Sequence, residues 1–405
     1  MKQKVVVIGH GYTSRLGVIR ALGREGYEVI VIVMTGYKSD GKTLITTKPI
    51  DCYSKYVGRV LYCPSDSKKL VQLLLSDCVD LQQKAVIIPD SDFSTAVVDE
   101  NAERLSKHFL FPHINHKPGE IVAWMDKFRQ KELAASIDLN VTKGCRIDIV
   151  DGVYSIPKEL QYPCFPKPLA TLVGGKCGLK RCNNEAELRD VIAIITQTNS
   201  TISILVEEFK KIDVEQALLG ITDGKEVIIP GVIKTKSLAN GGHFGVAKQG
   251  EILPVKGYEE LVEKFKEFVL KTRFVGIFDI DFYQSEGKFF FCEMNFRYGG
   301  SGYAYTAMGV NLPVMLVKTL TGVSVSGIQK KIKEKAIFVN ERMCRDDWAE
   351  GYISSMRFHR MLRKADISFV SDPNDPNPEK EFKKTLCGFN RNIKRIVKLV
   401  IKTIK

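Results

Sequence analysis

Several features that mark other protein classes are missing from this 405-residue sequence. No apolar run approaches the roughly 18 residues that indicate a membrane span, and the run at residues 5–8 is too short for a signal peptide. The ten cysteines include no C-x-x-C pair, which argues against a zinc site or a disulfide framework. No internal repeat is present. These absences favour a cytoplasmic, globular protein of two or three domains with reduced thiols.

Acidic residues are missing from residues 383–405, and the chain as a whole carries a net charge of +13. That segment contains eight basic residues: Lys383, Lys384, Arg391, Lys394, Arg395, Lys398, Lys402 and Lys405. The rest of the chain is therefore only mildly basic. A nucleic-acid-binding core is not required by this charge, and we expect no nucleic-acid partner.

Apolar residues recur at steps of three and four within the same basic segment, which predicts an amphipathic tail helix over residues 383–405. Such a helix can lie on an anionic membrane surface, here the inner face of the cell membrane. It can also dock its apolar stripe on the body of the protein. The sequence leaves both alternatives open.

The most informative segment that is present covers residues 278–303, F-D-I-D-F-Y-Q-S-E-G-K-F-F-F-C-E-M-N-F-R-Y-G-G-S-G-Y. It predicts two strands joined by a Ser-Glu-Gly turn. Because side chains alternate between the faces of a strand, Glu293, Asn295 and Arg297 point the same way, and Asp279 and Asp281 share a face. A strand that only packs would carry apolar residues there. Hard oxygen ligands beside a guanidinium suit Mg²⁺ held against phosphate, and a charged, exposed face is the alternative.

A lysine and a glycine-rich turn precede this hairpin in the chain. Lys167 ends an apolar strand, and residues 170–178, A-T-L-V-G-G-K-C-G, follow it with Lys176 near their middle. Backbone N–H groups of such a loop can cradle phosphate oxygens, and a lysine adds positive charge. The segment is not a P-loop, because no G-K-[ST] precedes a helix. A plain hairpin turn is the alternative interpretation.

The N-terminal segment predicts a βαβ unit over residues 4–33, and further βα segments extend an open α/β domain over about the first 110 residues. Gly9, Gly11 and Gly17 match a dinucleotide-binding fingerprint only loosely. Met34 and Thr35 stand where a ribose-binding acidic residue would be expected. A dinucleotide-dependent oxidoreductase is therefore a minor alternative.

Strand and helix patterns alternate through the middle of the chain. The predicted helices cover residues 120–135, 259–272 and 309–320, and the predicted strands cover residues 85–89, 162–167, 179–182 and 202–209. A further hairpin is predicted from residues 214–221 and 226–233, and Asn184 is expected to cap a helix. The pattern predicts a mixed α/β and α+β architecture.

In order and spacing, these motifs resemble the ATP-grasp superfamily from about residue 115 to residue 325. The matching features are Lys127, Lys167, the glycine loop, the V-E-E-F strand end at 206–209, Glu215, Asp281 and the E-M-N-F-R element at 293–297. That last element matches the family pattern E-x-N-x-R. The resemblance implies a Rossmann-like pre-ATP-grasp domain at residues 1–114. A two-subdomain ATP-grasp domain would follow at residues 115–325, with its lid subdomain at about residues 150–210, and a C-terminal extension would occupy residues 326–382.

The resemblance also implies that ATP and Mg²⁺ are bound by these residues. Lys127, Lys167 and the lid loop of Gly174, Gly175 and Lys176 would contact phosphates, Glu207, Glu208 and Phe209 would meet adenine, and Glu215 would meet the ribose. Asp281, Glu293 and Asn295 would hold Mg²⁺, Asp279 would be a neighbour, and Arg297 would stabilise the transferring phosphoryl group as the catalytic residue. The loop departs from the family pattern because it has no serine between its glycines. Lys234 and Lys236 are left open as further phosphate contacts.

We therefore predict a carboxylate–amine ligase that is similar to the D-aspartate ligase and carbamoyl-phosphate-synthase-like group. ATP would convert a carboxylate into an acyl phosphate, and an amine would attack it to give an amide, ADP and phosphate. The expected partners are a small-molecule carboxylate and amine, with cell-envelope or surface-polysaccharide precursors as one candidate class, and a homodimer is left open. The alternative from another class is a non-catalytic nucleotide-binding regulatory or scaffold protein.

Overall fold

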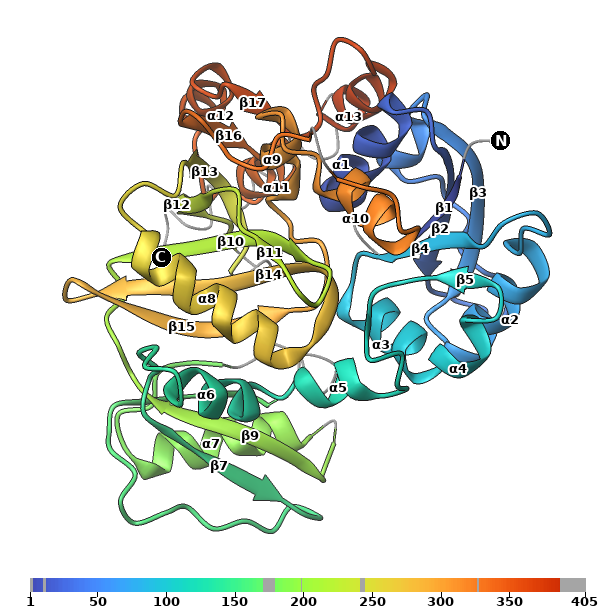
Figure 1. Ribbon diagram of the computed structural model, residues 1–405. Helices are drawn as coiled ribbons and strands as arrows, with labels where there is room; N and C mark the ends of the chain where they lie inside the picture. The colour runs from blue at the N-terminus through green and yellow to red at the C-terminus, as the bar shows by residue number, and fades with distance from the viewer. Residues whose placement is uncertain are drawn as a thin grey trace.

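Three β-sheets organise the described residues of the chain in the computed structural model (Figure 1). The structure describes residues 3–9, 12–169, 179–197, 199–240, 245–325 and 328–386. The glycine loop with Gly174, Gly175 and Lys176 therefore lies outside the described residues, and so does the predicted tail helix from residue 387 onward. Within the described part, no helix is both long enough and apolar enough to cross a membrane.

The first sheet is open and parallel, in the order β3-β2-β1-β4-β5. Its strands are β1 (Lys4–Gly9), β2 (Glu28–Thr35), β3 (Val57–Pro64), β4 (Ala85–Pro89) and β5 (Phe109–Leu110). One face packs against α1 (Thr13–Arg24) and the 3-10 helix η1 (Ile50–Tyr53), and the other against α2 (Ser67–Asp77), α3 (Asp92–Glu100) and α4 (Ala102–Leu105). Burial on both faces explains the continuous Val and Ile runs. The open α/β unit predicted for this region is present.

The second sheet has nine strands and carries the hairpin that stands out in the sequence. Its path is β15 (Lys288–Asn295), β14 (Phe274–Ser285), β10 (Val214–Thr222), β12 (Val232–Leu238), β13 (Ala247–Leu253), β16 (Ala336–Val339) and β17 (Ile367–Ser368). Two short strands pair beside this path, β11 (Val227–Ile228) with β10 and β6 (His113–Ile114) with β14. Glu286 and Gly287 form the turn between β14 and β15, and both have positive φ (50° and 76°), as a tight two-residue hairpin turn requires.

Apolar layers cover both faces of the second sheet. Helix α8 (Glu259–Thr272) packs Phe265 and Phe268 against Phe282 and Phe291 of the hairpin. On the other face, α9 (Gly302–Ala307) and α10 (Leu312–Leu320) lie between this sheet and α1 of the first sheet (Figure 1). The first and second sheets therefore share one hydrophobic core.

The third sheet is small and antiparallel, in the order β7-β9-β8. It consists of β7 (Gly144–Ile149), β9 (Ile202–Glu208) and β8 (Cys164–Pro168), with α7 (Glu185–Thr196) packed against it. Asn184 caps α7 by accepting a hydrogen bond from the Glu187 backbone, as predicted. The strand predicted at residues 179–182 is wrong in the part that is described, because only an isolated bridge joins Cys182 to Cys164 there.

The helix predicted over residues 120–135 is divided into α5 (Glu120–Trp124) and α6 (Lys127–Ala135). Asp126 interrupts it, since its side chain accepts hydrogen bonds from the Phe128 and Arg129 backbones and so starts a new helix. Gln130 then ties α6 to the second sheet by exchanging hydrogen bonds of 2.7 and 3.0 Å with the backbone of Met294 in β15. The break thus orients α6 across the hairpin.

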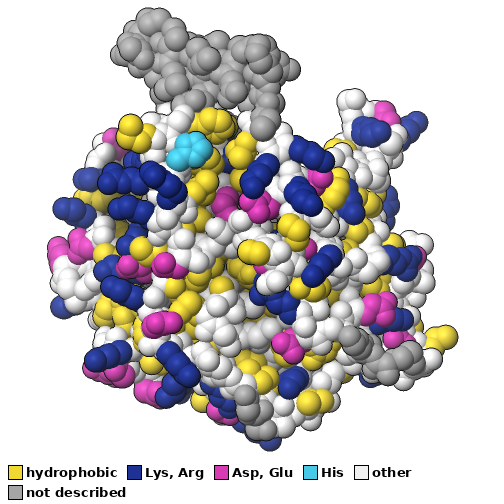
Figure 2. Space-filling model, turned by 90° about the horizontal axis from the view of Figure 1, so that it is seen from above, with side chains coloured by type: hydrophobic (Ala, Val, Ile, Leu, Met, Phe, Trp, Pro, Cys, Tyr) yellow, Lys and Arg dark blue, Asp and Glu magenta, His cyan; other side chains and the backbone are white. Residues whose placement is uncertain are grey.

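The described residues from 328 to 386 add β16, β17 and three helices: α11 (Glu341–Ala349), α12 (Ser355–Arg363) and α13 (Asn377–Leu386). It is anchored to the first sheet by buried ion pairs, because the Arg20 Nε of α1 lies 2.9 Å from Asp375 and 3.6 Å from Asp372. The eight described cysteines are all free. On the face seen from above, acidic side chains are interspersed among the lysine and arginine side chains (Figure 2).

Candidate functional site

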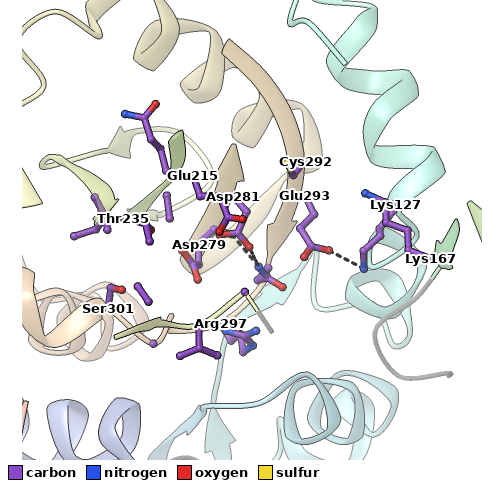
Figure 3. A pocket seen from close by; sticks show the side chains of 18 of the residues that line it. Lys127, Lys167, Glu215, Thr235, Asp279, Asp281, Cys292, Glu293, Arg297 and Ser301 are labelled. Carbon is purple, nitrogen blue, oxygen red and sulfur yellow. Dashed lines mark hydrogen bonds and ion pairs between the residues drawn. The ribbon is translucent and has the colours of Figure 1, made fainter. Parts of the chain in front are cut away.

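A cavity of about 580 Å³ lies between the second sheet, the third sheet and helix α6 (Figure 3). Its lining includes residues of α6, β8, β10, β12, β13, β14, β15 and the turn that follows β15. Seven of the residues predicted from the sequence line it: Lys127, Lys167, Glu215, Asp281, Glu293, Asn295 and Arg297. The fold therefore brings to one place residues that are distant in the sequence.

The oxygen-bearing side chains come from the two strands of the β14–β15 hairpin. In the antiparallel register, Asp281 lies opposite Glu293 and Asp279 lies opposite Asn295. The Asn295 Nδ2 donates a hydrogen bond of 3.2 Å to the Asp281 Oδ2. The side-chain alternation expected from the sequence thus places three carboxylates, those of Asp279, Asp281 and Glu293, and the Asn295 amide on the cavity side of the hairpin. Such a cluster of hard oxygen donors has the chemistry that Mg²⁺ prefers.

Lys127 faces these carboxylates from the first turn of α6 (Figure 3). Its Nζ lies 2.6 Å from the Glu293 Oε2. The side chain is about one-tenth exposed, so the ammonium group lies in a largely desolvated place where an ion pair is stronger than at the surface. The Asp126 cap fixes the start of α6 and thereby the position of Lys127.

A second cluster of charges lies beside the first and includes a residue that the sequence reasoning missed. The Glu207 carboxylate lies 2.5 Å from the Lys167 Nζ and also pairs with Lys131. Burial and the charge of Lys167 lower the pKa of Lys131 to about 7, and burial also lowers the pKa of Lys167. The signal that could have revealed Lys131 is its spacing, since it follows Lys127 by four residues on one helical face.

Arg297 is held by Asp92, which belongs to the helix that follows strand β4 of the first sheet. Its Nε donates a hydrogen bond of 2.7 Å to the Asp92 Oδ1, and Asp92 is the first residue of α3. Burial lowers the pKa of Arg297, but the charges of Asp92 and Asp279 outweigh burial and hold this pKa above its usual value. The guanidinium therefore stays charged and fixed at the edge of the cavity.

Asp279 shares the cavity but not the partners of Asp281. Its side chain is 8% exposed, and its Oδ1 is buried without a hydrogen-bond partner among the described residues. Burial raises the pKa of Asp279 to about 6, Arg297 lowers it, and Glu293 and Asp92 raise it further. The residue that the sequence ranked as a mere neighbour is thus the more deeply enclosed of the two aspartates.

Other predicted residues do not line this cavity. Glu207 belongs to the lysine cluster, Glu208 lies 3.2 Å from the Lys210 Nζ, and Phe209 is 38% exposed beneath the Arg181 guanidinium. Of the two lysines left open on β12, Lys236 pairs with Glu251 at 2.7 Å, and Lys234 is flanked by Ile233 and Thr235, which do line the cavity. Because side chains alternate between the two faces of a strand, the Lys234 side chain points away from the cavity.

Comparison with known proteins relates this arrangement to a family. Residues 126–326 match the family model described as carbamoyl-phosphate synthase L chain, ATP binding domain. A carbamoyl phosphate synthase large chain from Gemmatimonas aurantiaca is 21% identical over 360 residues, covering 84% of this chain and 30% of that protein. The large chain from Clostridium botulinum is 26% identical over 314 residues, covering 73% and 27%. The chain thus spans less than one third of the length of these curated relatives.

Solved structures share the fold. An L-amino acid ligase from Bacillus licheniformis is similar with a TM-score of 0.59 and 15% identity, covering 83% of this chain and 79% of that chain. An N5-carboxyaminoimidazole synthetase from Staphylococcus aureus complexed with ADP has a TM-score of 0.59 and 17% identity, covering 84% and 83%. At these identities the likeness is one of architecture.

Proposed function

Because residues 126–326 of this chain belong to the ATP-grasp family, we propose that the protein is an ATP- and Mg²⁺-dependent ligase that joins a carboxylate to an amine. One observation carries the proposal. Asp281, Glu293 and Asn295 meet Lys127 and Lys167 across a single cavity with Arg297 at its edge. Oxygen ligands, lysines and a fixed guanidinium are the groups that phosphoryl transfer requires.

The proposed reaction has two steps that need no covalent protein nucleophile. A carboxylate oxygen of the acid attacks the γ-phosphorus of ATP, and ADP leaves, which gives an acyl phosphate. The amine nitrogen then attacks the acyl carbon. The bond from that carbon to the phosphate oxygen breaks, and the nitrogen loses a proton as the amide forms. The chain's contribution is positioning and charge neutralisation.

The residues divide this work according to their places. Asp281, Glu293 and Asn295 would hold Mg²⁺, which when bound supplies charge neutralisation to the phosphate oxygens. The Asn295 amide nitrogen is engaged by Asp281, so its oxygen would be the metal ligand. Arg297 would stabilise the transferring phosphoryl group, and Glu215 would meet the ribose hydroxyls.

The ion pairs that Lys127 and Lys167 form with carboxylates support this assignment. Lys127 pairs with Glu293 and Lys167 with Glu207, so each ammonium group has a carboxylate to neutralise it before nucleotide binds. Binding of phosphates would draw both lysines away, and Glu293 would then be free to serve as a Mg²⁺ ligand. Lys131 would remain with Glu207 and prevent a buried, uncompensated carboxylate.

We extend the proposal to the domains. The first sheet would be the Rossmann-like pre-ATP-grasp domain, and the third sheet would form the lid subdomain with the loop of Gly174, Gly175 and Lys176. The V-E-E-F strand end, including Glu208 and Phe209, would meet adenine. Proteins of similar architecture include an L-amino acid ligase and an N5-carboxyaminoimidazole synthetase, so the fold does not identify the acid and the amine, which have to be found by experiment.

Hydroxylamine tests the first half of the reaction without knowledge of the amine. This small nucleophile traps an acyl phosphate as a hydroxamate, so a panel of carboxylic acids supplied with ATP, Mg²⁺ and hydroxylamine should reveal the acid by hydroxamate and ADP formation. We expect one acid class to give both products. ATP binding without hydroxamate from any acid in the panel would favour a regulatory nucleotide-binding protein instead.

Glu293→Gln tests the metal site directly. We expect hydroxamate formation to fall by at least about 100-fold, because the variant loses a metal ligand and leaves Lys127 without its carboxylate. Glu286→Gln, in the turn of the same hairpin, is the matched control and should keep full activity. Undiminished activity of Glu293→Gln would contradict the metal assignment.

A further inference from the structure

Helix α12, at the top of the molecule in Figure 1, exposes an apolar side chain within a basic surface. Phe358 and Met361 are buried in an apolar cluster that α12 shares with α11. Met356, Arg360 and Arg363 follow one another at steps of four and three residues, so they lie together on the opposite face of the helix. All three are exposed, and the exposed fraction of Met356 is 80%. A largely solvated methionine thus lies on the same face as two guanidinium groups.

The positive charge of this helix is not balanced by acidic residues. Residues 351–365 contain four basic residues and no acidic one. These four form no ion pair with any residue that the structure describes: Arg357, Arg360, Arg363 and Lys364. On α7, α8 and α13, by contrast, lysine or arginine side chains pair with a glutamate one turn away at 2.6 or 2.7 Å. The charge on α12 is therefore available to a partner outside the described chain.

A second basic segment begins beside α12. Leu386 packs against the same apolar cluster as Phe358 and Met361. Residues 387–405 follow it directly and contain six basic residues and no acidic one. Because this segment and α12 have charge of the same sign, they do not neutralise each other, and a second copy of α12 would not do so either. Both segments favour an anionic partner.

We propose that the exposed face of α12 docks on the surface of an anionic lipid bilayer. Met356 would insert at the boundary of the acyl chains, and Arg360 and Arg363 would contact lipid phosphates, which guanidinium groups bind with paired hydrogen bonds. A bilayer offers both a layer of negative charge and an apolar layer beneath it, whereas a nucleic acid backbone offers only the charge. This inference does not depend on the proposed ligase function.

Sedimentation with lipid vesicles measures this docking in the whole chain. We expect the wild type to bind vesicles of equal parts phosphatidylglycerol and phosphatidylcholine, and not vesicles of phosphatidylcholine alone. The double variant Arg360→Glu/Arg363→Glu should lower the partition coefficient for the anionic vesicles at least about 10-fold, because it reverses two charges at the lipid surface. Hydroxamate formation and the melting temperature should stay unchanged, since both side chains are exposed.

A matched control separates this face from the net charge of the protein. Lys225→Glu/Lys288→Glu reverses two exposed lysines at hairpin turns of the second sheet and gives the same net charge as the α12 variant. It should lower the partition coefficient by less than about 3-fold. If both double variants lose binding equally, or if the wild type does not bind the anionic vesicles, the proposal is overturned.

Met356→Ser distinguishes a lipid surface from other polyanions. The variant keeps every charge but loses the side chain that would insert, so it should lower the partition coefficient about 3- to 10-fold. Its melting temperature should match that of the wild type, because Met356 is exposed. Vesicle binding that is unchanged by Met356→Ser would assign the face to polyanions in general, such as a nucleic acid, and would overturn the proposal.

Discussion

At the residue scale, each described lysine and arginine of the candidate site forms an ion pair with a carboxylate. Lys127 lies 2.6 Å from Glu293, and Arg297 lies 2.7 Å from Asp92. Charges removed from water are stable only when such partners neutralise them. The site is therefore preformed as a set of ion pairs that phosphates and a metal ion can exchange, and little conformational rearrangement of the hairpin is needed.

Lys131 gives a pH-dependent prediction for stability. The pKa of Lys131 is about 7 in the folded protein, whereas an ordinary lysine exposed to water, as in the unfolded chain, has a pKa of 10.5. Between these values the unfolded chain binds more protons than the folded one. The free energy of unfolding should therefore rise with pH above 7, by at most about 1.4 kcal/mol per pH unit from this group.

Urea unfolding of the wild type and of Lys131→Met at pH 7 and pH 9 measures this effect. The gain in unfolding free energy between the two pH values should be larger for the wild type than for the variant. Lys225→Met, which removes an exposed lysine, should follow the wild type. If the free energy of unfolding changed by the same amount between pH 7 and pH 9 in the wild type and in Lys131→Met, Lys131 would be shown to stay protonated over this range.

The β14–β15 hairpin and α8 form a unit at the scale of elements. The hairpin directs Asp279, Asp281 and Glu293 to the cavity. It directs Phe282 and Phe291 to α8, where the rings of Phe268 and Phe291 lie 4.8 Å apart. This alternation was readable in the sequence, because a strand has a period of two residues. The hairpin and the helix at residues 259–272 could be predicted for that reason. The single helix expected at residues 120–135 was wrong, because one capping aspartate outweighed a continuous helical pattern.

Packing between α8 and the hairpin yields a prediction of stability. Phe268 is fully buried, so Phe268→Ala should lower the free energy of unfolding by about 3–5 kcal/mol through lost burial and a remaining cavity. Leu270→Ala removes a side chain that is 37% exposed on the same helix and should cost much less. Urea unfolding measures both, and equal losses would contradict the packing described for α8.

The first and second sheets are joined at the scale of the whole molecule by a shared core and by polar contacts across it. Helices α9 and α10 fill the space between the sheets, and the Asp92–Arg297 pair crosses the same junction. The first sheet thus reaches the candidate site through the Asp92 side chain, at the N-terminus of α3. This contact makes Asp92 a positioning residue for Arg297.

Asp92→Asn tests that role. The charge-assisted hydrogen bond to Arg297 is worth about 1.5–3 kcal/mol, so a loosened guanidinium should lower kcat for hydroxamate formation by roughly 10- to 100-fold. The KM for ATP should remain nearly unchanged, because Asp92 does not line the cavity. Asp92→Glu should recover part of the rate, and Glu103→Gln on α4 is the matched control. A rise in KM with unchanged kcat would contradict the positioning role.

The features that depend on local period and on the order of motifs can be read from the amino-acid sequence. Alternation placed Asp281, Glu293 and Asn295 on one side of a hairpin, and the order of motifs along the chain pointed to the ATP-grasp family. Only the tertiary structure decided which charges meet. Lys131 and Asp92 pair with Glu207 and Arg297 across different elements, and Asp279 is enclosed by a turn that approaches it closely. Such contacts depend on how sheets and helices pack, and burial rather than sequence spacing sets their strength.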